Sequence, residues 1–213
     1  MTSITPGLHL EQTLWQQDIQ IIGGIDEAGR GAWAGPVAAA VVVLPNNPQI
    51  GLILSGVRDS KQMTARARAR WALTIQSVAV AWCVGMASAT EIDEIGILPA
   101  TRLAMSRAID GLVRRPQHFL FDFIHWKDCP YSPNEKLVKG ESQSLSIAAA
   151  SVLAKTTRDA FMRDLDAVHP NYGFARHKGY GTALHRDAIG EHGLCGEHRK
   201  TFRIGEQRIE SKE

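Results

Sequence analysis

Residues 19–45 read IQIIGGIDEAGRGAWAGPVAAAVVVLP and contain two apolar runs joined by a glycine-rich bend. The first run ends in the acid pair Asp26 and Glu27, and the second is rich in valine and closed by a proline–asparagine turn. Short β-branched runs bounded by turn residues are typical of strands, and two in succession predict a hairpin. The stretch therefore predicts paired strands with two carboxylates and Arg30 beside the bend, which we name the glycine bend (residues 29–36).

The rest of the chain predicts a mixed α/β domain around one sheet. We expect further strands over residues 78–88, 118–123 and 136–141, and helices over residues 64–78, 99–113, 144–169 and 182–193, with a shorter helix before residue 99. In the longest helix a mostly apolar stripe from Ile147 to Val168, with Phe161 in it, recurs at steps of three and four, so we expect it to pack on the sheet. Residues 172–182 read as a basic loop, and the polar tail, residues 206–213, is expected to fray.

Length and composition restrict the class of protein. A chain of 213 residues with 44% hydrophobic residues suits one domain. The net charge is only +2, so an anionic partner must be bound by a local basic patch. Three separated cysteines without a C-x-x-C motif argue against a disulfide framework or a zinc site and fit a reducing compartment, so we expect a cytoplasmic protein. Neither a signal peptide nor a membrane span is predicted.

Two aspartates end apolar runs. Asp122 lies within the run FLFDF, where a charge is costly unless it is paired or binds a cation. Glu27 can join Asp26 in one site only if the backbone bends, which Gly29 and Gly31 permit. Side-by-side carboxylates on neighbouring strands call for a divalent cation, and such a cluster suits two-metal cleavage of a phosphodiester. The alternative for Asp122 is a strand-end residue that caps a loop or pairs with an arginine.

The glycine bend does not have the G-x-G-x-x-G spacing of a dinucleotide site, and a valine-rich run follows it instead of a helix. Its bare backbone would let a ribose or phosphate come close to Arg30, the alternative being a plain hairpin loop with glycines at positive φ. The loop at residues 176–182, RHKGYGT, combines cations, glycines and a tyrosine, as loops that contact a sugar–phosphate backbone do.

Other basic residues have weaker signals. On the helix expected after Thr64, Arg66 and Arg70 share a side as candidate phosphate contacts, whereas Arg68 points away and is expected on a solvated face. The segment at residues 196–202, GEHRKTF, is expected to carry surface cations. His185, His192 and His198 match no standard set of metal ligands.

Several motifs in order resemble those of one family, the ribonuclease HII enzymes, which are the type 2 ribonucleases H of bacteria. The motifs are GIDEAGRG, DSK at residues 59–61, EID at 91–93, FLFD, KGES at 139–142, SIAAASVLAKTTRD at 146–159 and YGFARHKGYGT at 172–182. The resemblance covers residues 21–202. It implies a ribonuclease H-like α/β fold, with a mixed five-stranded sheet flanked by helices and a small helical C-terminal part.

The resemblance also implies an activity. The enzyme would cleave the RNA strand of RNA–DNA hybrids and incise 5′ to a single ribonucleotide in duplex DNA, leaving 5′-phosphate and 3′-hydroxyl ends, with Mn²⁺ or Mg²⁺ as cofactor. The partner is nucleic acid, no membrane is involved, and we expect a monomer. The domain limits are an N-terminal extension (1–18), a catalytic domain (19–168), a basic and helical C-terminal part (169–205) and a polar tail (206–213).

Site residues follow from the same motifs. Asp26, Glu27, Asp122 and Glu141 match the metal-binding, catalytic acids. Substrate-binding positions are the glycine-bend residues Gly29, Arg30 and Gly31, which match the loop that reads the 2′-hydroxyl, together with Lys61 for a phosphate, Tyr180 for the adjoining deoxyribose, and Lys178 in the same loop.

The chain departs from the family pattern at two positions. Phe123 stands where the family has glycine, and Glu141 stands where it has aspartate, one methylene shorter. Asp159 is a reserve acid, although a salt bridge to a nearby arginine on the long helix is the favoured interpretation. Two rival functions stay open: a related nuclease without a ribose requirement, and a hybrid-binding module that does not cleave.

Overall fold

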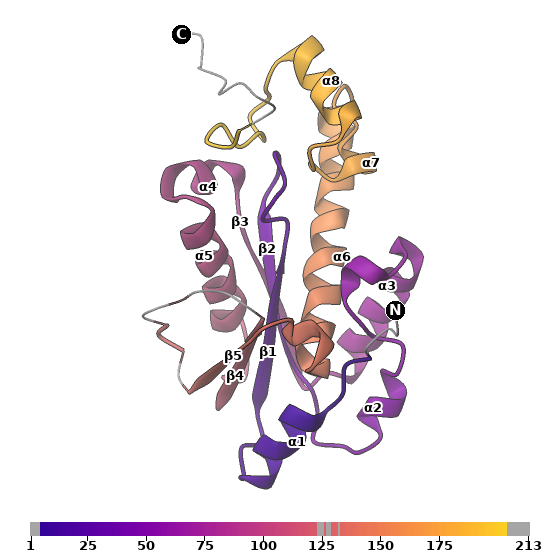
Figure 1. The fold of residues 1–213 in the computed structure, drawn as a ribbon, viewed down its shortest axis with the longest axis vertical. Helices are drawn as coiled ribbons and strands as arrows, with labels where there is room; N and C mark the ends of the chain where they lie inside the picture. The colour runs from indigo at the N-terminus through magenta and orange to yellow at the C-terminus, as the bar shows by residue number, and fades with distance from the viewer. Residues whose placement is uncertain (1–4, 123–125, 127–128, 132, 204–213) are drawn as a thin grey trace.

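The computed structural model describes residues 5–122, 126, 129–131 and 133–203. Phe123 and the tail at 206–213 lie outside the described residues. Within them a five-stranded sheet has the order β3-β2-β1-β4-β5 (Figure 1). The strands are β1 (Ile22–Ala28), β2 (Val37–Val43), β3 (Ala81–Ala87), β4 (His118–Asp122) and β5 (Asn134–Leu137). The expected mixed five-stranded sheet is therefore confirmed.

The hairpin prediction is also confirmed, because β1 and β2 pair antiparallel with Asp26 opposite Ala40. Strand β2, VAAAVVV, is buried along its whole length, as its β-branched and alanine residues suggest. On its other side β1 pairs in parallel with β4, up to Ile25 opposite Phe121. The next residues along these two strands are Asp26 and Asp122, so the sheet register sets the two acids beside each other.

Helices cover both faces of the sheet. Helices α4 and α5 lie on one face, and α3 and α6 on the other (Figure 1). The bounds are α1 (His9–Gln16), α2 (Ile50–Ile53), α3 (Ala65–Val78), α4 (Ala89–Ile95), α5 (Ile97–Asp110), α6 (Leu145–Val168), α7 (Phe174–His177) and α8 (Ala183–His192), with 3₁₀ turns η1 (Ser60–Gln62) and η2 (Gly140–Ser142). Thr64 caps α3, since its hydroxyl accepts the N–H of Ala67.

Helix α6 packs directly on β1. A Cβ atom built on Gly24 would lie 2.3 Å from the carbonyl carbon of Ser146, so glycine is needed for this close approach. The apolar stripe expected for α6 is wrong at its C-terminal end, where Phe161 and Val168 are exposed. The helix there extends past the sheet, and Met162 instead is buried, against a small cluster that includes residues of α7 and α8.

Two local features differ from expectation. The last strand is β5, and only Lys136 and Leu137 of the expected segment 136–141 belong to it; Glu141 lies in η2, after Lys139 in a left-handed conformation. The predicted basic loop contains the short helix α7. In the N-terminal extension, α1 buries Glu11, whose Oε1 accepts hydrogen bonds from the hydroxyls of Ser144 and Ser146.

No helix of the described residues is long and apolar enough to cross a membrane.

Candidate active site

The predicted acids lie at the ends of two neighbouring strands and in the turn after a third. Asp26 is buried at the end of β1 and accepts the N–H of Glu27 at 2.7 Å. Asp122 at the end of β4 accepts the N–H of Gly140 through Oδ1, also at 2.7 Å. This bond holds η2 against the end of β4 and so brings Glu141 to the two strand ends. Asp122 therefore caps a loop, as its alternative interpretation proposed, while also lying beside the other acids.

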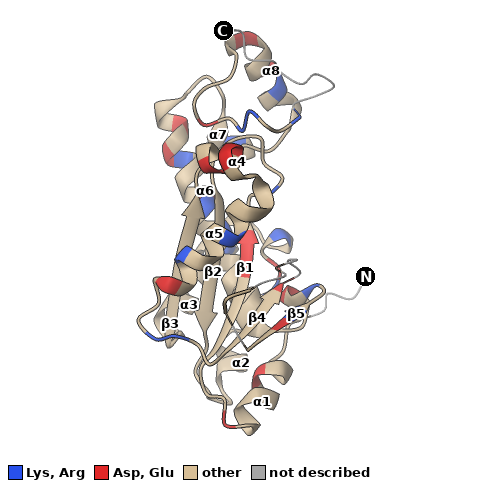
Figure 2. Ribbon diagram, turned by 90° about the vertical axis from the view of Figure 1, so that its left-hand side faces the viewer, with Lys and Arg blue, Asp and Glu red and all other residues tan. Residues whose placement is uncertain are grey.

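Burial and mutual repulsion disfavour the ionised forms of these acids. Burial raises the pKa of Asp26 well above its ordinary value, and the charges of Glu27 and Asp122 raise it further. The pKa of Glu27 is raised by burial, against the opposing effect of Arg30. Burial and then the Asp122 carboxylate raise the pKa of Glu141. Figure 2 shows the resulting acidic tip of β1 with basic segments of neighbouring elements around it.

A divalent cation fits this set of carboxylates. Glu27 Oε2 and Glu141 Oε2 are buried without a hydrogen-bond partner in the described part of the chain, which is costly for a charged group. Hard cations take such carboxylate oxygens as ligands. No three acidic, histidine or cysteine side chains among the described residues form a ready-made cage. Asp26, Asp122 and Glu27 are each held by a separate partner, namely the N–H of Glu27, the N–H of Gly140 and the guanidinium of Arg30.

The glycine bend begins beside these acids. Arg30 Nη1 lies 3.0 Å from Glu27 Oε1, and the arginine side chain stays 40% exposed. The two glycines that flank Arg30 differ in their surroundings. Gly29 has φ +95°, and a Cβ atom there would lie 2.0 Å from Nε of Arg158, whereas a Cβ on Gly31 would meet nothing within 4 Å. Gly29 is therefore required by packing, and Gly31 leaves the outer side of the bend open.

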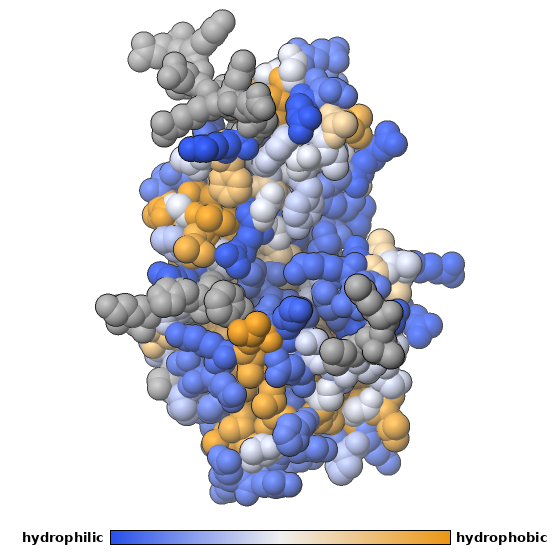
Figure 3. All heavy atoms as spheres, in the orientation of Figure 1, coloured by the Kyte–Doolittle hydropathy of each residue, from blue (hydrophilic) through white to orange (hydrophobic). Residues whose placement is uncertain are grey.

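The bend forms one wall of a hollow of about 520 Å³. Predicted residues that line it are Glu27, Gly29, Arg30, Gly31, Lys61 and Tyr180. Residues that the sequence reasoning missed also line it, namely Ala28, Ser60, Ile97, Lys155 and Phe202. An apolar patch lies where α4 passes into α5, and its exposed residues include Ile95 and Leu98 (Figure 3). Of the four predicted acids only Glu27 lines the hollow, which thus combines one carboxylate with cations and an apolar margin, a mixture that suits a sugar–phosphate chain.

Two lysines and a tyrosine of the predicted site have distinct surroundings. Burial alone would lower the pKa of Lys61, but the charges of nearby acids raise it overall. These acids are Asp26, Asp59, Glu141 and Glu27, so the ammonium group of Lys61 lies among the predicted metal ligands. Tyr180 lies under two cations, with Lys155 Nζ 5.2 Å and Arg158 Cζ 5.4 Å from its ring centre. Lys178 donates to the carbonyl of Ala175 and does not line the hollow.

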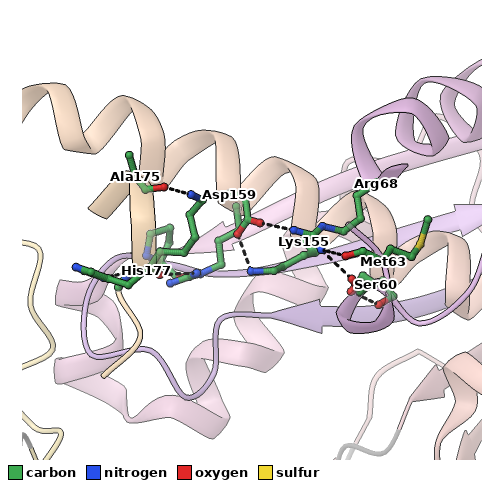
Figure 4. A network of polar contacts seen from close by, with 12 residues as sticks. Ser60, Met63, Arg68, Lys155, Asp159, Ala175 and His177 are labelled. Carbon is green, nitrogen blue, oxygen red and sulfur yellow. Dashed lines mark hydrogen bonds and ion pairs between the residues drawn. The ribbon is translucent and has the colours of Figure 1, made fainter. Parts of the chain in front are cut away.

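Asp159 anchors a network between α3 and α6, shown in Figure 4. Its carboxylate pairs with Lys155 at 2.7 Å and with Arg68 at 3.1 Å, and Arg68 also donates to the carbonyls of Ser60 and Met63. The expected salt bridge of Asp159 to an arginine is present, but the expectation that this arginine lies on the long helix is wrong, because it is Arg68 of α3. The expectation of a solvated Arg68 is wrong, because that side of α3 faces α6. The network fixes the turn that carries Lys61.

The segment after α8 also differs from expectation. Arg199 is fully buried, so the assignment of residues 196–202 as a carrier of surface cations is wrong for this residue, while Lys200 is exposed. His185 and His198 are buried together, with their Nε2 atoms 3.0 Å apart. His185 stacks on His177 at 4.2 Å between ring centres. These histidines pack the C-terminal part together, a role that their sequence spacing did not indicate.

Known proteins resemble the chain over nearly its whole length. A family model described as Ribonuclease HII matches residues 23–205. A Ribonuclease HII of Geobacillus kaustophilus is 47% identical over 195 residues, which cover 92% of this chain and 73% of the relative. A Ribonuclease HII of Dehalococcoides mccartyi is 44% identical over 201 residues, which cover 94% of each chain.

Solved structures share the fold. The ribonuclease H2 of Pyrococcus horikoshii OT3 superposes with a TM-score of 0.72 at 23% identity, covering 86% of this chain and 94% of that one. Bst-RNase HIII, solved in complex with Mn²⁺, gives a TM-score of 0.65 at 20% identity, covering 82% of this chain and 63% of that one. At such identities the likeness supports the expected α/β architecture.

Proposed function

The chain belongs to the ribonuclease HII family, and on this basis we propose how its site selects and cleaves a substrate. As a member it is a ribonuclease H, a divalent-metal-dependent endonuclease that hydrolyses the RNA strand of RNA–DNA hybrids. The finer activity that we propose is incision 5′ to a single ribonucleotide embedded in duplex DNA, which leaves 5′-phosphate and 3′-hydroxyl ends.

The proposed metal ligands are Asp26, Glu27, Asp122 and Glu141, holding Mn²⁺ or Mg²⁺. A bound cation of this kind activates water and offsets the charge of the leaving 3′-oxygen. The chain itself contributes the fixed strand ends that aim Asp26 and Asp122 at one point, and the Gly140 N–H that orients Asp122. Glu141, one methylene longer than aspartate, supplies a buried oxygen without a protein partner among the described residues.

The glycine bend is the proposed ribose reader. Gly29, Arg30 and Gly31 expose backbone on the open side of the hollow, where a 2′-hydroxyl, the group that distinguishes RNA from DNA, can approach. Tyr180 would support the neighbouring deoxyribose, and the proposed phosphate contacts are Lys61 in the hollow and Lys178 outside it. The observation that carries this proposal is the placement of Glu27, the bend and Tyr180 in the same hollow. We also propose that the protein acts as a cytoplasmic monomer.

The test is cleavage of an end-labelled DNA duplex with one ribonucleotide, in Mn²⁺, Mg²⁺ or EDTA, beside an all-DNA duplex. We expect metal-dependent incision 5′ to the ribonucleotide and an intact control. The Asp122→Asn variant should lose cleavage while it still binds the hybrid. Cleavage of the all-DNA duplex would favour a nuclease without a ribose requirement.

A hybrid-binding module that does not cleave is the second candidate, because Glu141 stands where the family pattern has aspartate. Binding without turnover in either metal, by a folded protein, would favour it. Restoration of cleavage by Glu141→Asp would then identify the cause.

A further inference from the structure

Two arginines without exposed surface support the glycine bend from inside. Arg199 donates from Nε to the carbonyl of Gly35 at 3.0 Å, from Nη1 to that of Arg30 at 2.9 Å and from Nη2 to that of Gly29 at 2.8 Å. Arg158 of α6 donates to the carbonyls of Pro36, Lys178 and Ala34 at 2.7 to 3.1 Å. Five of these six carbonyls belong to the bend.

Among the described residues no carboxylate lies within ion-pair distance of either guanidinium, so carbonyl dipoles solvate both buried charges. Burial lowers the pKa of Arg199 to about 9, with a further contribution from Arg158, so the side chain is still charged at neutral pH. A buried charge is tolerated only with dense hydrogen bonding. The hydrogen bonds to the two arginines therefore fix the orientation of these carbonyls in the folded protein.

The direction of a carbonyl determines the direction of the next N–H. A trans peptide unit is planar, and its C=O and N–H point to opposite sides. Because the carbonyls of Gly29 and Arg30 point at the buried Arg199, the N–H groups of Arg30 and Gly31 point away from it. Gly31 has open space around its Cα, on the side of the hollow. Arg199 thus aims two backbone donors outward.

The segment that carries Arg199 is itself fixed. Its N–H donates to the carbonyl of Trp33 at 2.8 Å, and the N–H of Gly35 donates to the carbonyl of Glu197 at 2.8 Å. Directly after Arg199, the N–H groups of Lys200 and Thr201 donate to Asp93 of α4 at 2.9 and 3.0 Å. The bend is therefore held by a C-terminal segment that α4 keeps in place.

We propose that Arg199 is a positioning residue that sets the ribose selectivity of the glycine bend by orienting its two outward N–H donors. The inference rests on the proposed function and deepens it. Arg199 itself touches no substrate. Its removal should weaken the contribution of the 2′-hydroxyl and leave the phosphate contacts of the duplex unchanged.

The decisive measurement is a ratio of affinities. In the full chain carrying Asp122→Asn, which prevents turnover, dissociation constants are measured for an all-DNA duplex and for the same duplex with one ribonucleotide. Arg199→Lys keeps the charge but cannot span three carbonyls. We expect it to reduce the ribose-dependent gain in affinity about tenfold, the effect of one lost hydrogen bond, with all-DNA affinity within about twofold. Arg186→Lys, at an exposed position of α8, is the matched control and should change neither value.

A second variant keeps the proposal testable if Arg199→Lys unfolds. Asp93→Ala removes the anchor of the segment without creating a buried cavity, and we expect a smaller loss of the same ratio, about threefold. An unchanged ratio in a folded Arg199→Lys protein, or equal weakening of both duplexes, would overturn the positioning role. If the Asp122→Asn protein with Arg199 intact binds the two duplexes equally well, the proposed ribose selectivity is wrong. That result is seen before any Arg199 variant is measured, so it is distinguishable from a failure of the positioning role.

Discussion

Two groups of residues lie beside the hollow in opposite electrostatic situations: the proposed catalytic side, formed by the acids, and the proposed recognition side, formed by the glycine bend and the arginines behind it. On the catalytic side, Asp26, Glu27 and Glu141 have raised pKa values, and two buried carboxylate oxygens have no partner among the described residues. On the recognition side, the buried guanidinium groups of Arg158 and Arg199 each reach three carbonyls. Folding therefore supplies hydrogen-bond partners for the buried charges of the recognition side, whereas we expect the carboxylates of the catalytic side to be neutralised by a cation. Substitutions on the two sides should have opposite effects on stability.

The largest expected effect is on the catalytic side. Asp26→Asn should lower the cleavage rate by about a thousandfold or more, because it removes a charge from the metal site. The same change should raise the melting temperature in EDTA, since it relieves repulsion from Glu27 and Asp122. Asp187→Asn, at an exposed position of α8, is the control for both measurements. A fall in the metal-free melting temperature would show that the acids are not strained by one another.

On the recognition side, removal of a charge should destabilise the protein. Arg158→Met leaves three buried carbonyls without their donor, which should cost about 3 kcal/mol or more of the free energy of unfolding in urea. Arg163→Met, at an exposed position of the same helix, should cost little. A loss for Arg158→Met no larger than for Arg163→Met would mean that the carbonyls find other donors, and the contrast between the two sides would fail.

The sequence predicts the catalytic side better than the recognition side. Acids at the ends of apolar strands have a signature, because strand period and burial penalty both mark Asp26 and Asp122. The hydrogen-bond partners of Arg158 and Arg199 are backbone carbonyls. Every residue type has a backbone carbonyl, so no sequence pattern identifies these partners. Arg68 was assigned to solvent for a related reason: helical spacing gives its direction on α3, but only tertiary packing shows that Asp159 lies there.

The glycines of the bend divide between the two roles. Gly29→Ala should destabilise the protein by about 2 kcal/mol, because φ is +95° and the added methyl meets Arg158. Gly31→Ala should leave the urea midpoint nearly unchanged and lower ribonucleotide incision about tenfold, since its methyl would project into open space that we assign to the ribose. Equal stability losses for both variants would show that Gly31 is packed as Gly29 is.

The smallest predicted effect is a loosening of the recognition side in acid. The pKa of both His185 and His198 is lowered to about 4, mainly by burial and in part by the neighbouring His177. The unfolded chain therefore binds these protons first, so the stability from the neutral rings is fully present above pH 6.5 and is lost as pH falls toward 4.

The ring of Trp33 lies 5.7 Å from that of His185, so its fluorescence, taken as the difference from a Trp33→Phe protein, reports the change locally. We expect a spectral shift between pH 6.5 and 4 that is smaller in a folded His198→Gln protein, while His192→Gln, at an exposed position of α8, leaves it unaltered. If the shift is the same in the parent protein, the His198→Gln protein and the His192→Gln protein, the titrating group lies elsewhere. The recognition side would then be insensitive to acid, as a network built only on guanidinium groups and carbonyls would be.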